Sequence, residues 1–210
     1  MPCGDFRLYL VTDRRQTAGR PLAPLIQEAL VAGLQAVQLR ERDLGTRALL
    51  RLAGELLHLT RGRNAALLIN DRADMVMGLG ADGVHLRADS VPVSVARRIL
   101  GAERLVGASA HSADDVVRAE SEGADFVVLG PIYPTTSKLA YGAPIGVGPL
   151  EDAARRCRIP VFAIGGISAE RVAEVTRAGA FGVAVISSIL TAPHVGQATQ
   201  HLLSALAHAP

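Results

Sequence analysis

Residues 113–138 read ADDVVRAESEGADFVVLGPIYPTTSK, and they contain every part of a unit that recurs along the chain. The first ten residues place apolar side chains on one face and charged side chains on the other, which is typical of an amphipathic helix. Gly123 suits a left-handed helix cap, and the apolar run Phe126–Leu129 predicts a buried strand. This strand leads into a proline-containing loop that ends in Thr135, Thr136, Ser137 and Lys138.

The same alternation recurs along all 210 residues. Eight strands are predicted, at Arg7–Val11, Ala36–Leu39, Ala66–Ile69, Gly83–Leu86, Leu105–Gly107, Phe126–Leu129, Val161–Ile164 and Gly182–Ile186. The clearest helices are predicted at Leu22–Ala32, Arg47–Leu59, Val93–Leu100, Ala113–Glu122 and Ala169–Ala178. Apolar strands separated by helices indicate a covered parallel sheet, and eight such units favour a (β/α)8 TIM barrel, one α/β domain over residues 1–210. A doubly wound open sheet is the alternative, which the lack of GxGxxG after the first strand disfavours.

Composition argues against several classes of partner. The net charge is +2, aromatic residues make up 3% and Trp is absent, so we expect no nucleic-acid partner. No apolar run approaches the ~20 residues that cross a bilayer, and the N-terminus lacks the apolar core of a signal peptide. Cys3 and Cys157 form no metal-ligand pattern and are expected to be free thiols. These features predict a cytoplasmic protein with no membrane partner.

Barrels carry their chemistry on the loops that follow the strands, where this chain has polar residues or glycines. The hydroxyls and lysine of residues 135–138 suit a phosphate or pyrophosphate, although a plain polar turn is the alternative. Gly165 and Gly166 would let the backbone approach a ligand, or would form only a tight turn. Ser187 would contact the same phosphate or cap a helix, and both roles are compatible.

A second anion site is predicted across the barrel. Gln38, Arg40 and Arg42 alternate along one strand, so their side chains share a face. Two guanidinium groups on one face repel each other unless an anion, such as a diphosphate, lies between them. Asn70 and Asp71 end the next strand, and a carboxylate among basic groups suggests Mg²⁺.

Other interpretations of these residues remain open. The arginines would otherwise pair with Glu41 or Asp43, or be solvated at the rim of the barrel. Asp71 would pair with Arg72 or cap the helix that follows. His111 is the candidate general acid or base, with a packed rim histidine as its alternative. His85 lies in a run that looks buried, which indicates a structural residue.

Together these motifs resemble the thiamine phosphate synthase family over nearly the whole chain. The motifs are YLVTD (9–13), VQLRER (37–42), INDR (69–72), ADGVHL (81–86), SAHS (109–112), GPIYPTTSK (130–138), AIGGI (163–167) and VISSI (185–189). The resemblance implies a (β/α)8 transferase of thiamine biosynthesis. Members join 4-amino-2-methyl-5-hydroxymethylpyrimidine diphosphate to hydroxyethylthiazole phosphate, or its carboxylate, and release pyrophosphate with Mg²⁺ present. The implied partners are these small phosphorylated substrates, and a homodimer is compatible with the sequence.

The resemblance also implies roles for individual residues. Contacts to the pyrimidine diphosphate would come from Gln38, Arg40, Arg42, Asn70, Ser109 and Lys138. Contacts to the thiazole phosphate would come from Thr135, Ser137, Gly166, Ile186 and Ser187. The catalytic residues would be His111, Lys138 and Arg40, and Asp71 would bind Mg²⁺.

The chain departs from the family pattern at three places. Arg42 replaces a lysine, and Ser137 replaces a threonine. Residues 87–90 read RADS where the family has Gly-Gln-acid-Asp, so Ser90 stands in the place of a second Mg²⁺ carboxylate and Asp89 precedes it. These losses resemble the thiazole tautomerases, a sister branch that transfers a proton with a histidine at the position of His111. The synthase is the favoured interpretation, the tautomerase is the alternative, and a non-catalytic phosphate-binding regulator is a third.

Overall fold

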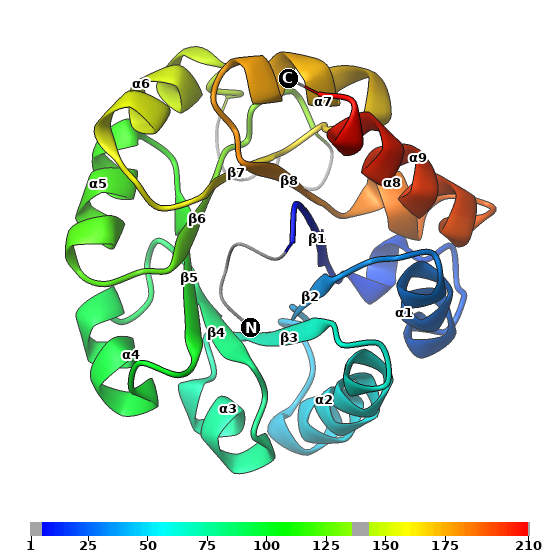
Figure 1. The fold of residues 1–210 in the computed structure, drawn as a ribbon. Coiled ribbons are helices and arrows are strands. Elements are labelled where there is room, and N and C mark those ends of the chain that lie inside the picture. Colours follow the sequence, from blue (N-terminus) through cyan, green and yellow to red (C-terminus); the bar gives the residue numbers. More distant parts are fainter. Residues whose placement is uncertain (1–5, 136–142, 210) are drawn as a thin grey trace.

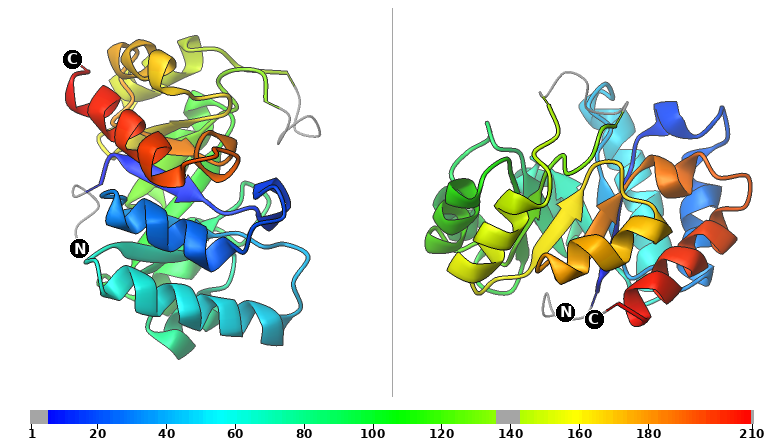
Figure 2. Two further views of the ribbon diagram at one scale, coloured as in Figure 1. Left: turned by 90° about the vertical axis from the view of Figure 1, so that its right-hand side faces the viewer. Right: turned by 90° about the horizontal axis from the view of Figure 1, so that it is seen from above.

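Eight parallel strands close into a barrel inside a ring of helices (Figure 1). The computed structural model describes residues 6–135 and 143–209. Strands that are adjacent in the chain pair with each other, and β1 closes the ring by pairing with β8. The side-on views of Figure 2 show the helices lying alongside the strands. The predicted (β/α)8 barrel is confirmed, and the open-sheet alternative is wrong.

The predicted strands are all present. They are β1 (Leu8–Val11), β2 (Ala36–Leu39), β3 (Ala66–Asn70), β4 (Gly83–Leu86), β5 (Leu105–Ala110), β6 (Phe126–Leu129), β7 (Val161–Ile164) and β8 (Gly182–Val185). Seven of them match their predicted ends to within one residue, whereas β5 continues three residues further, to Ala110. This extension places Ser109 inside a strand.

The helices pack around the outside of the barrel. They are α1 (Leu22–Val31), α2 (Thr46–Arg61), α3 (Ala73–Leu79), α4 (Val93–Leu100), α5 (Ala113–Ser121), α6 (Gly148–Arg156), α7 (Ala169–Arg177), α8 (Ser187–Leu190) and α9 (Val195–Ala207), with a 3-10 turn η2 (Arg14–Gln16). The glycines that follow α1, α3, α5 and α7 have positive φ, which confirms the left-handed cap predicted at Gly123 and repeats it at three other helices. No helix within residues 6–135 and 143–209 is long and apolar enough to cross a bilayer.

An aromatic cluster fills the barrel interior below the carboxyl ends of the strands. Phe6, Tyr9, Phe126 and Phe162 are fully buried there, and neighbouring ring centroids lie 5.3–6.2 Å apart. Gly107 faces this cluster, because a Cβ at that position would lie 2.4 Å from Phe126 Cζ. The missing side chain of Gly107 therefore makes room for the ring of Phe126.

The layer above the aromatic cluster forms the mouth of the barrel. Side chains alternate along a strand, so a residue two places beyond an interior residue also faces inward. Continuing from the interior in this way gives Val11, Gln38, Asn70, Ser109, Val128, Ile164 and Ile186. The fold therefore brings residues from seven strands or strand ends to one place.

Candidate active site

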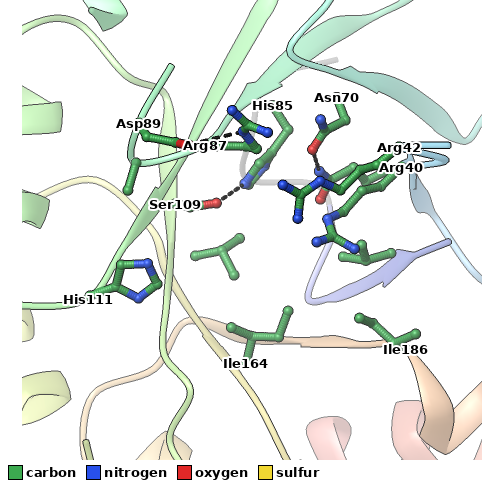
Figure 3. Close-up of a pocket in the computed structure, with 14 residues that line it drawn as sticks. Arg40, Arg42, Asn70, His85, Arg87, Asp89, Ser109, His111, Ile164 and Ile186 are labelled. Atoms are coloured by element: carbon green, nitrogen blue, oxygen red, sulfur yellow. Dashed lines mark hydrogen bonds and ion pairs between the residues drawn. The ribbon is translucent and has the colours of Figure 1, made fainter. Parts of the chain in front are cut away.

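A pocket of 370 Å³ opens at the carboxyl ends of the strands (Figure 3). Its apolar lining consists mainly of Val11, Val128, Ile164 and Ile186. Its polar lining consists of Gln38, Arg40, Arg42, Asn70, His85, Arg87, Asp89, Ser109 and His111. The residues predicted for the diphosphate site thus lie together, except Lys138, which falls outside the described residues.

Two hydrogen bonds between neighbouring strands fix the polar side chains at the base of this pocket. Gln38 Nε2 donates to Asn70 Oδ1 at 2.9 Å, which joins β2 to β3. His85 Nε2 and Ser109 Oγ lie 3.0 Å apart, which joins β4 to β5. His85 is buried, as predicted for a structural residue, yet it also lines the pocket. His85 pairs with Asn70 in the β3–β4 register, so its side chain lies at the same level of the barrel as a predicted ligand residue. This register is the signal that would have placed His85 in the pocket.

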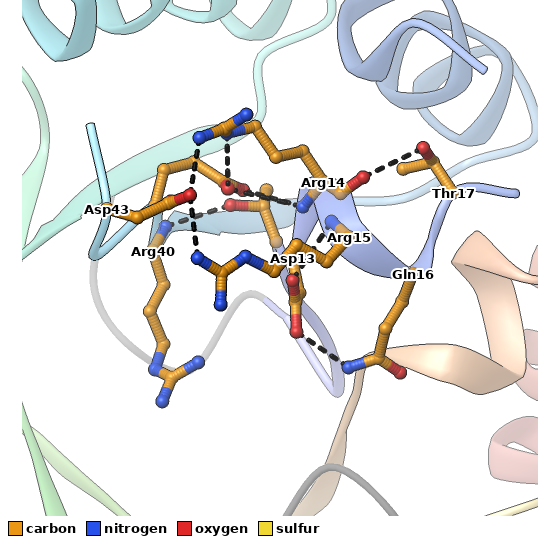
Figure 4. A network of polar contacts seen from close by, with 9 residues as sticks. Asp13, Arg14, Arg15, Gln16, Thr17, Arg40 and Asp43 are labelled. Carbon is orange, nitrogen blue, oxygen red and sulfur yellow. Dashed lines mark hydrogen bonds and ion pairs between the residues drawn. The ribbon is translucent and has the colours of Figure 1, made fainter. Parts of the chain in front are cut away.

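The loop that carries the two arginines is anchored by Glu41. It adjoins a polar network in which Arg14 and Arg15 contact Asp43 (Figure 4). Both carboxylate oxygens of Glu41 lie 3.2 Å from the Arg14 backbone N–H that donates to them. The Thr12 side chain hydrogen-bonds to the Glu41 carboxylate, and the Thr12 hydroxyl also accepts the backbone N–H of Arg40 at 2.9 Å. A buried carboxylate and a buried hydroxyl therefore set the path of the chain through Arg40.

The two acidic residues next to Arg40 and Arg42 in the sequence form ion pairs with arginines of the 3-10 turn η2. Asp43 Oδ2 lies 2.6 Å from Arg14 Nη2 and 2.9 Å from Arg15 Nη2. Glu41 Oε2 lies 3.6 Å from Arg14 Nε. Figure 3 shows the guanidinium groups of Arg40 and Arg42 close together at the pocket. Glu41 and Asp43 thus form ion pairs with arginines of η2, and the anion site at Arg40 and Arg42 stays a prediction.

Glu41→Gln is expected to gain stability relative to the wild type as the pH rises. Burial raises the pKa of Glu41 above its ordinary value of 4.5. The folded protein therefore holds this proton more tightly than the unfolded chain, and ionisation of Glu41 weakens the fold as the pH rises above that value. Glutamine does not ionise. Urea unfolding free energies of both proteins, measured from about pH 4 to about pH 7, give the difference directly.

Asp74→Asn is the matched control, because its pH dependence has the opposite sign. The hydrogen bond from Arg72 lowers the pKa of Asp74 below its ordinary value of 3.8. The stability that Asp74 contributes is present above that value and is lost as the pH falls through the folded pKa, so the asparagine variant should lose relative stability as the pH rises. A constant difference between Glu41→Gln and the wild type would contradict the assigned burial effect.

His111 lies at the rim in a defined ring orientation. Its Nδ1 lies 2.6 Å from the carbonyl oxygen of Gly130, and its backbone N–H donates to Asp115 Oδ2 at 3.2 Å. A carbonyl oxygen only accepts, so Nδ1 carries the hydrogen and Nε2 is the basic nitrogen of the neutral ring. The Ser112–Asp115 capping box begins α5 directly after His111 and fixes the backbone there. His111 is therefore positioned by two neighbouring elements.

Asp71, the predicted Mg²⁺ ligand, contacts Arg87. Its Oδ2 lies 2.7 Å from Arg87 Nε, and its Oδ1 accepts the backbone N–H of Arg87 at 3.0 Å. Arg72, and not Asp71, is the N-cap of α3. Among the described residues, no group of three or more His, Cys, Asp or Glu could hold a metal ion. These side chains do not fit a protein-held Mg²⁺, because a guanidinium already lies against the Asp71 carboxylate.

A second, smaller pocket of 20 Å³ adjoins the first and shares Ile164 and Ile186 with it. Thr135, Gly166 and Ser187 line it, as predicted for the thiazole phosphate site, while Ser137 falls outside the described residues. Ser187 is the first residue of α8, so it is not the cap.

The glycine of the smaller pocket is required by close packing. Gly166 has φ +64°, and a Cβ there would lie 2.7 Å from the carbonyl oxygen of Pro134. Arg171 donates to the Gly166 carbonyl at 2.6 Å and its guanidinium stacks 4.3 Å from the centroid of the Tyr133 ring. The loop after β7 is thereby held against the loop after β6.

Residues 8–189 match a family model described as thiamine monophosphate synthase. The chain belongs to this family. A Geobacter sulfurreducens protein is 47% identical over 202 residues, which cover 96% of this chain and 95% of that protein. A thiamine-phosphate synthase of Roseiflexus sp. (strain RS-1) is 41% identical over 208 residues, which cover 99% and 88%. The structure of thiamine phosphate pyrophosphorylase from Pyrococcus furiosus has a TM-score of 0.86 at 34% identity and covers 96% of this chain and 95% of its own.

The thiamine monophosphate synthase family resemblance drawn from the sequence is therefore confirmed. The roles of individual residues stay predictions, although the fold groups them as expected. Two polar residues of the pocket wall, His85 and Arg87, were not assigned a ligand role from the sequence. Arg87 was marked only as a departure from the family pattern, since nothing in the spacing indicates which carboxylate it contacts.

Proposed function

We propose that the protein is a thiamine-phosphate synthase that joins 4-amino-2-methyl-5-hydroxymethylpyrimidine diphosphate to hydroxyethylthiazole phosphate, or its carboxylate, and releases pyrophosphate. The observation that carries this proposal is the pair of adjoining pockets. The larger pocket presents Arg40 and Arg42, and the smaller one presents Gly166 and hydroxyl groups. Two anionic substrates need two such sites, and the apolar surface between them suits the rings. The relatives that are named thiamine-phosphate synthases support the proposal.

The coupling breaks one bond and forms another at the same carbon. The bond between the pyrimidine methylene carbon and the diphosphate oxygen breaks, and its electron pair leaves with pyrophosphate. The thiazole nitrogen donates its lone pair to the methylene carbon, and no proton leaves that nitrogen. When the carboxylate is the substrate, its carboxyl group also leaves as carbon dioxide, and a proton takes its place on the ring. Arg40 and Arg42 stabilise the negative charge that grows on the leaving group, while the pockets align the reacting atoms. Val128 and Ile164 line the larger pocket with apolar surface, which disfavours water beside the methylene carbon.

Three expectations from the sequence stay predictions. Mg²⁺ would act at the diphosphate by neutralising charge, but the contacts of Asp71 give no support to a protein-held ion, so no step is assigned to it. The homodimer and the cytoplasmic location likewise await measurement. Size-exclusion chromatography with light scattering would test the first of these two.

Purified protein supplied with both substrates and Mg²⁺ is expected to form thiamine phosphate and pyrophosphate in equal amounts. Chromatography with mass detection measures the first product, and a coupled phosphate assay measures the second. Omission of the thiazole phosphate is the control for simple hydrolysis of the diphosphate. A protein that binds both substrates and forms no thiamine phosphate would refute the synthase.

The position of His111 favours one further candidate, the thiazole tautomerase. The family resemblance implies a catalytic role for His111, but the coupling step needs no proton transfer from the thiazole nitrogen. In the synthase, His111→Ala is therefore expected to lower kcat/KM for coupling less than about tenfold, below the usual contribution of a general acid or base. In a tautomerase, loss of the general acid or base would cost about 10²–10⁴-fold. Assays of both reactions with the wild type and His111→Ala separate the two functions. The tautomerase would be established if the wild type showed no coupling activity but did show tautomerase activity, and if His111→Ala lost that tautomerase activity.

A further inference from the structure

Arg87 follows β4 directly and lines the large pocket across from Arg40 and Arg42 (Figure 3). Its Nε lies 2.7 Å from Asp71 Oδ2 and 3.0 Å from Asp89 Oδ1. Nε is buried and makes a hydrogen bond with neither carboxylate, so these contacts are ion pairs. The guanidinium is thus held between two carboxylates at the edge of the pocket.

The backbone at Asp71 is shaped for this contact. Asp71 has φ 55°, a left-handed conformation that costs a residue other than glycine about 1 kcal/mol or more. Its N–H donates to the His85 carbonyl oxygen at 3.0 Å, while its Oδ1 accepts the Arg87 N–H. These bonds hold the Asp71 carboxylate against both the backbone and the side chain of Arg87. The strained residue therefore serves to position an arginine.

The charges around the pocket favour an anion with several negative charges. Among the described residues that line it, three are arginines and Asp89 is the only acidic one. The side chain of Arg87 is 34% exposed, so it is accessible to a ligand while it stays paired. A guanidinium group forms paired hydrogen bonds with phosphate oxygens and keeps its charge at any physiological pH.

We propose that Arg87 binds the diphosphate and supplies the positive charge that a protein-held metal ion would supply at this rim. This inference rests on the proposed function and describes how its diphosphate site works. Carboxylates are the ligands that hard cations prefer, and here the two carboxylates of the rim hold a guanidinium. Arg87 cannot dissociate as a metal ion does. Pyrophosphate should therefore bind to the protein in the absence of divalent cations.

Isothermal titration of the EDTA-treated protein with inorganic pyrophosphate tests the proposal. The wild type is expected to bind, and Arg87→Ala is expected to bind about 10- to 100-fold more weakly. Arg87→Lys should recover part of the affinity, since it restores a charge without the paired hydrogen bonds. Arg72→Ala is the matched control: the Arg72 side chain is similarly exposed, at 32%, but pairs with Asp74 and does not line the pocket. It should bind pyrophosphate as the wild type does.

Manganese binding, followed by electron paramagnetic resonance, gives a second readout. The wild type without pyrophosphate is expected to leave Mn²⁺ in solution. The proposal would be overturned if the wild type and both Arg87 variants bound pyrophosphate with equal affinity. It would also be overturned if the wild type bound Mn²⁺ without pyrophosphate and bound pyrophosphate only when Mn²⁺ was present. Thermal melting of each variant checks folding. A protein whose pyrophosphate binding depends on Arg87, but which forms no thiamine phosphate, would refute the synthase and leave this inference standing.

Discussion

Arg40→Ala is expected to lower kcat/KM for the pyrimidine diphosphate by about 100-fold or more. The Arg40 side chain lines the pocket beside Arg42, where charge develops on the departing pyrophosphate. Removal of one group that stabilises such charge typically costs 10²–10³-fold in kcat. The backbone contact of Arg40 with Thr12 does not involve the guanidinium, so the loop should keep its path. Steady-state kinetics with saturating thiazole phosphate measures the effect.

Two further variants separate charge from geometry at this position. Arg40→Lys keeps a positive charge and loses the planar pair of donors, so its activity should fall between those of the wild type and the alanine variant. Arg47→Ala removes an exposed arginine from the first turn of α2 and is expected to keep nearly full activity. Coupling at the wild-type rate by Arg40→Ala would exclude Arg40 from the diphosphate site and weaken the assignment of the large pocket.

The barrel itself could be predicted from the sequence because its strands are short, apolar and separated by capped amphipathic helices. The end of β5 was the exception, since residues 108–110 read ASA and resemble a loop. Inside the barrel, Gly107 faces the ring of Phe126, and Ser109 faces the pocket beside His85, so small residues suit a strand there. The end of β5 is therefore determined by tertiary packing, which a local sequence pattern does not contain.

The gathering of the site residues could also be predicted, because alternation along parallel strands places Gln38, Asn70 and Ser109 at one end of the barrel. The partners of the charged residues could not. Asp71 contacts Arg87 because of its left-handed backbone, and Glu41 contacts the backbone of Arg14 across two loops. Neither loop conformation follows from periodicity. The sequence thus indicated which residues lie at the mouth of the barrel. Only the structure shows which of their charged side chains form ion pairs with each other.

The contacts of Arg87 change how its departure from the family pattern is interpreted. An altered segment at residues 87–90 looks, in sequence, like the loss of a metal ligand. In the structure Arg87 Nε lies against both Asp71 and Asp89, and we propose that this guanidinium supplies the positive charge of a metal ion held there. The change therefore need not argue against diphosphate chemistry. It instead makes the dependence on divalent cations the property in which this protein is expected to differ.

Phe126→Ala is expected to destabilise the protein by about 3–5 kcal/mol, the usual cost of removing a buried phenylalanine side chain. The ring of Phe126 lies 5.5 Å from those of Tyr9 and Phe162 and 5.8 Å from that of His85, measured between centroids. A chain of this size loses about 2–4 °C in Tm per kcal/mol, so the melting temperature should fall by roughly 10 °C. Denaturant unfolding gives the free energy.

The matched control is Phe181→Ala. Phe181 is only partly buried, and its ring lies 5.7 Å from that of Phe162 at the edge of the cluster, so its loss should cost clearly less. Gly107→Ala tests the packing of the cluster from the neighbouring strand, because a Cβ at position 107 would lie 2.4 Å from Phe126 Cζ. As a single substitution, overpacking of this kind lowers the free energy of unfolding by about 1–3 kcal/mol. In the Phe126→Ala background the contact with the ring disappears, while His85 Nδ1 still lies 2.8 Å from the new Cβ. The double variant should therefore lose less stability than the two single losses added together. Strict additivity would mean that the two positions do not share the interior as described, and that the floor of the pocket is supported in another way.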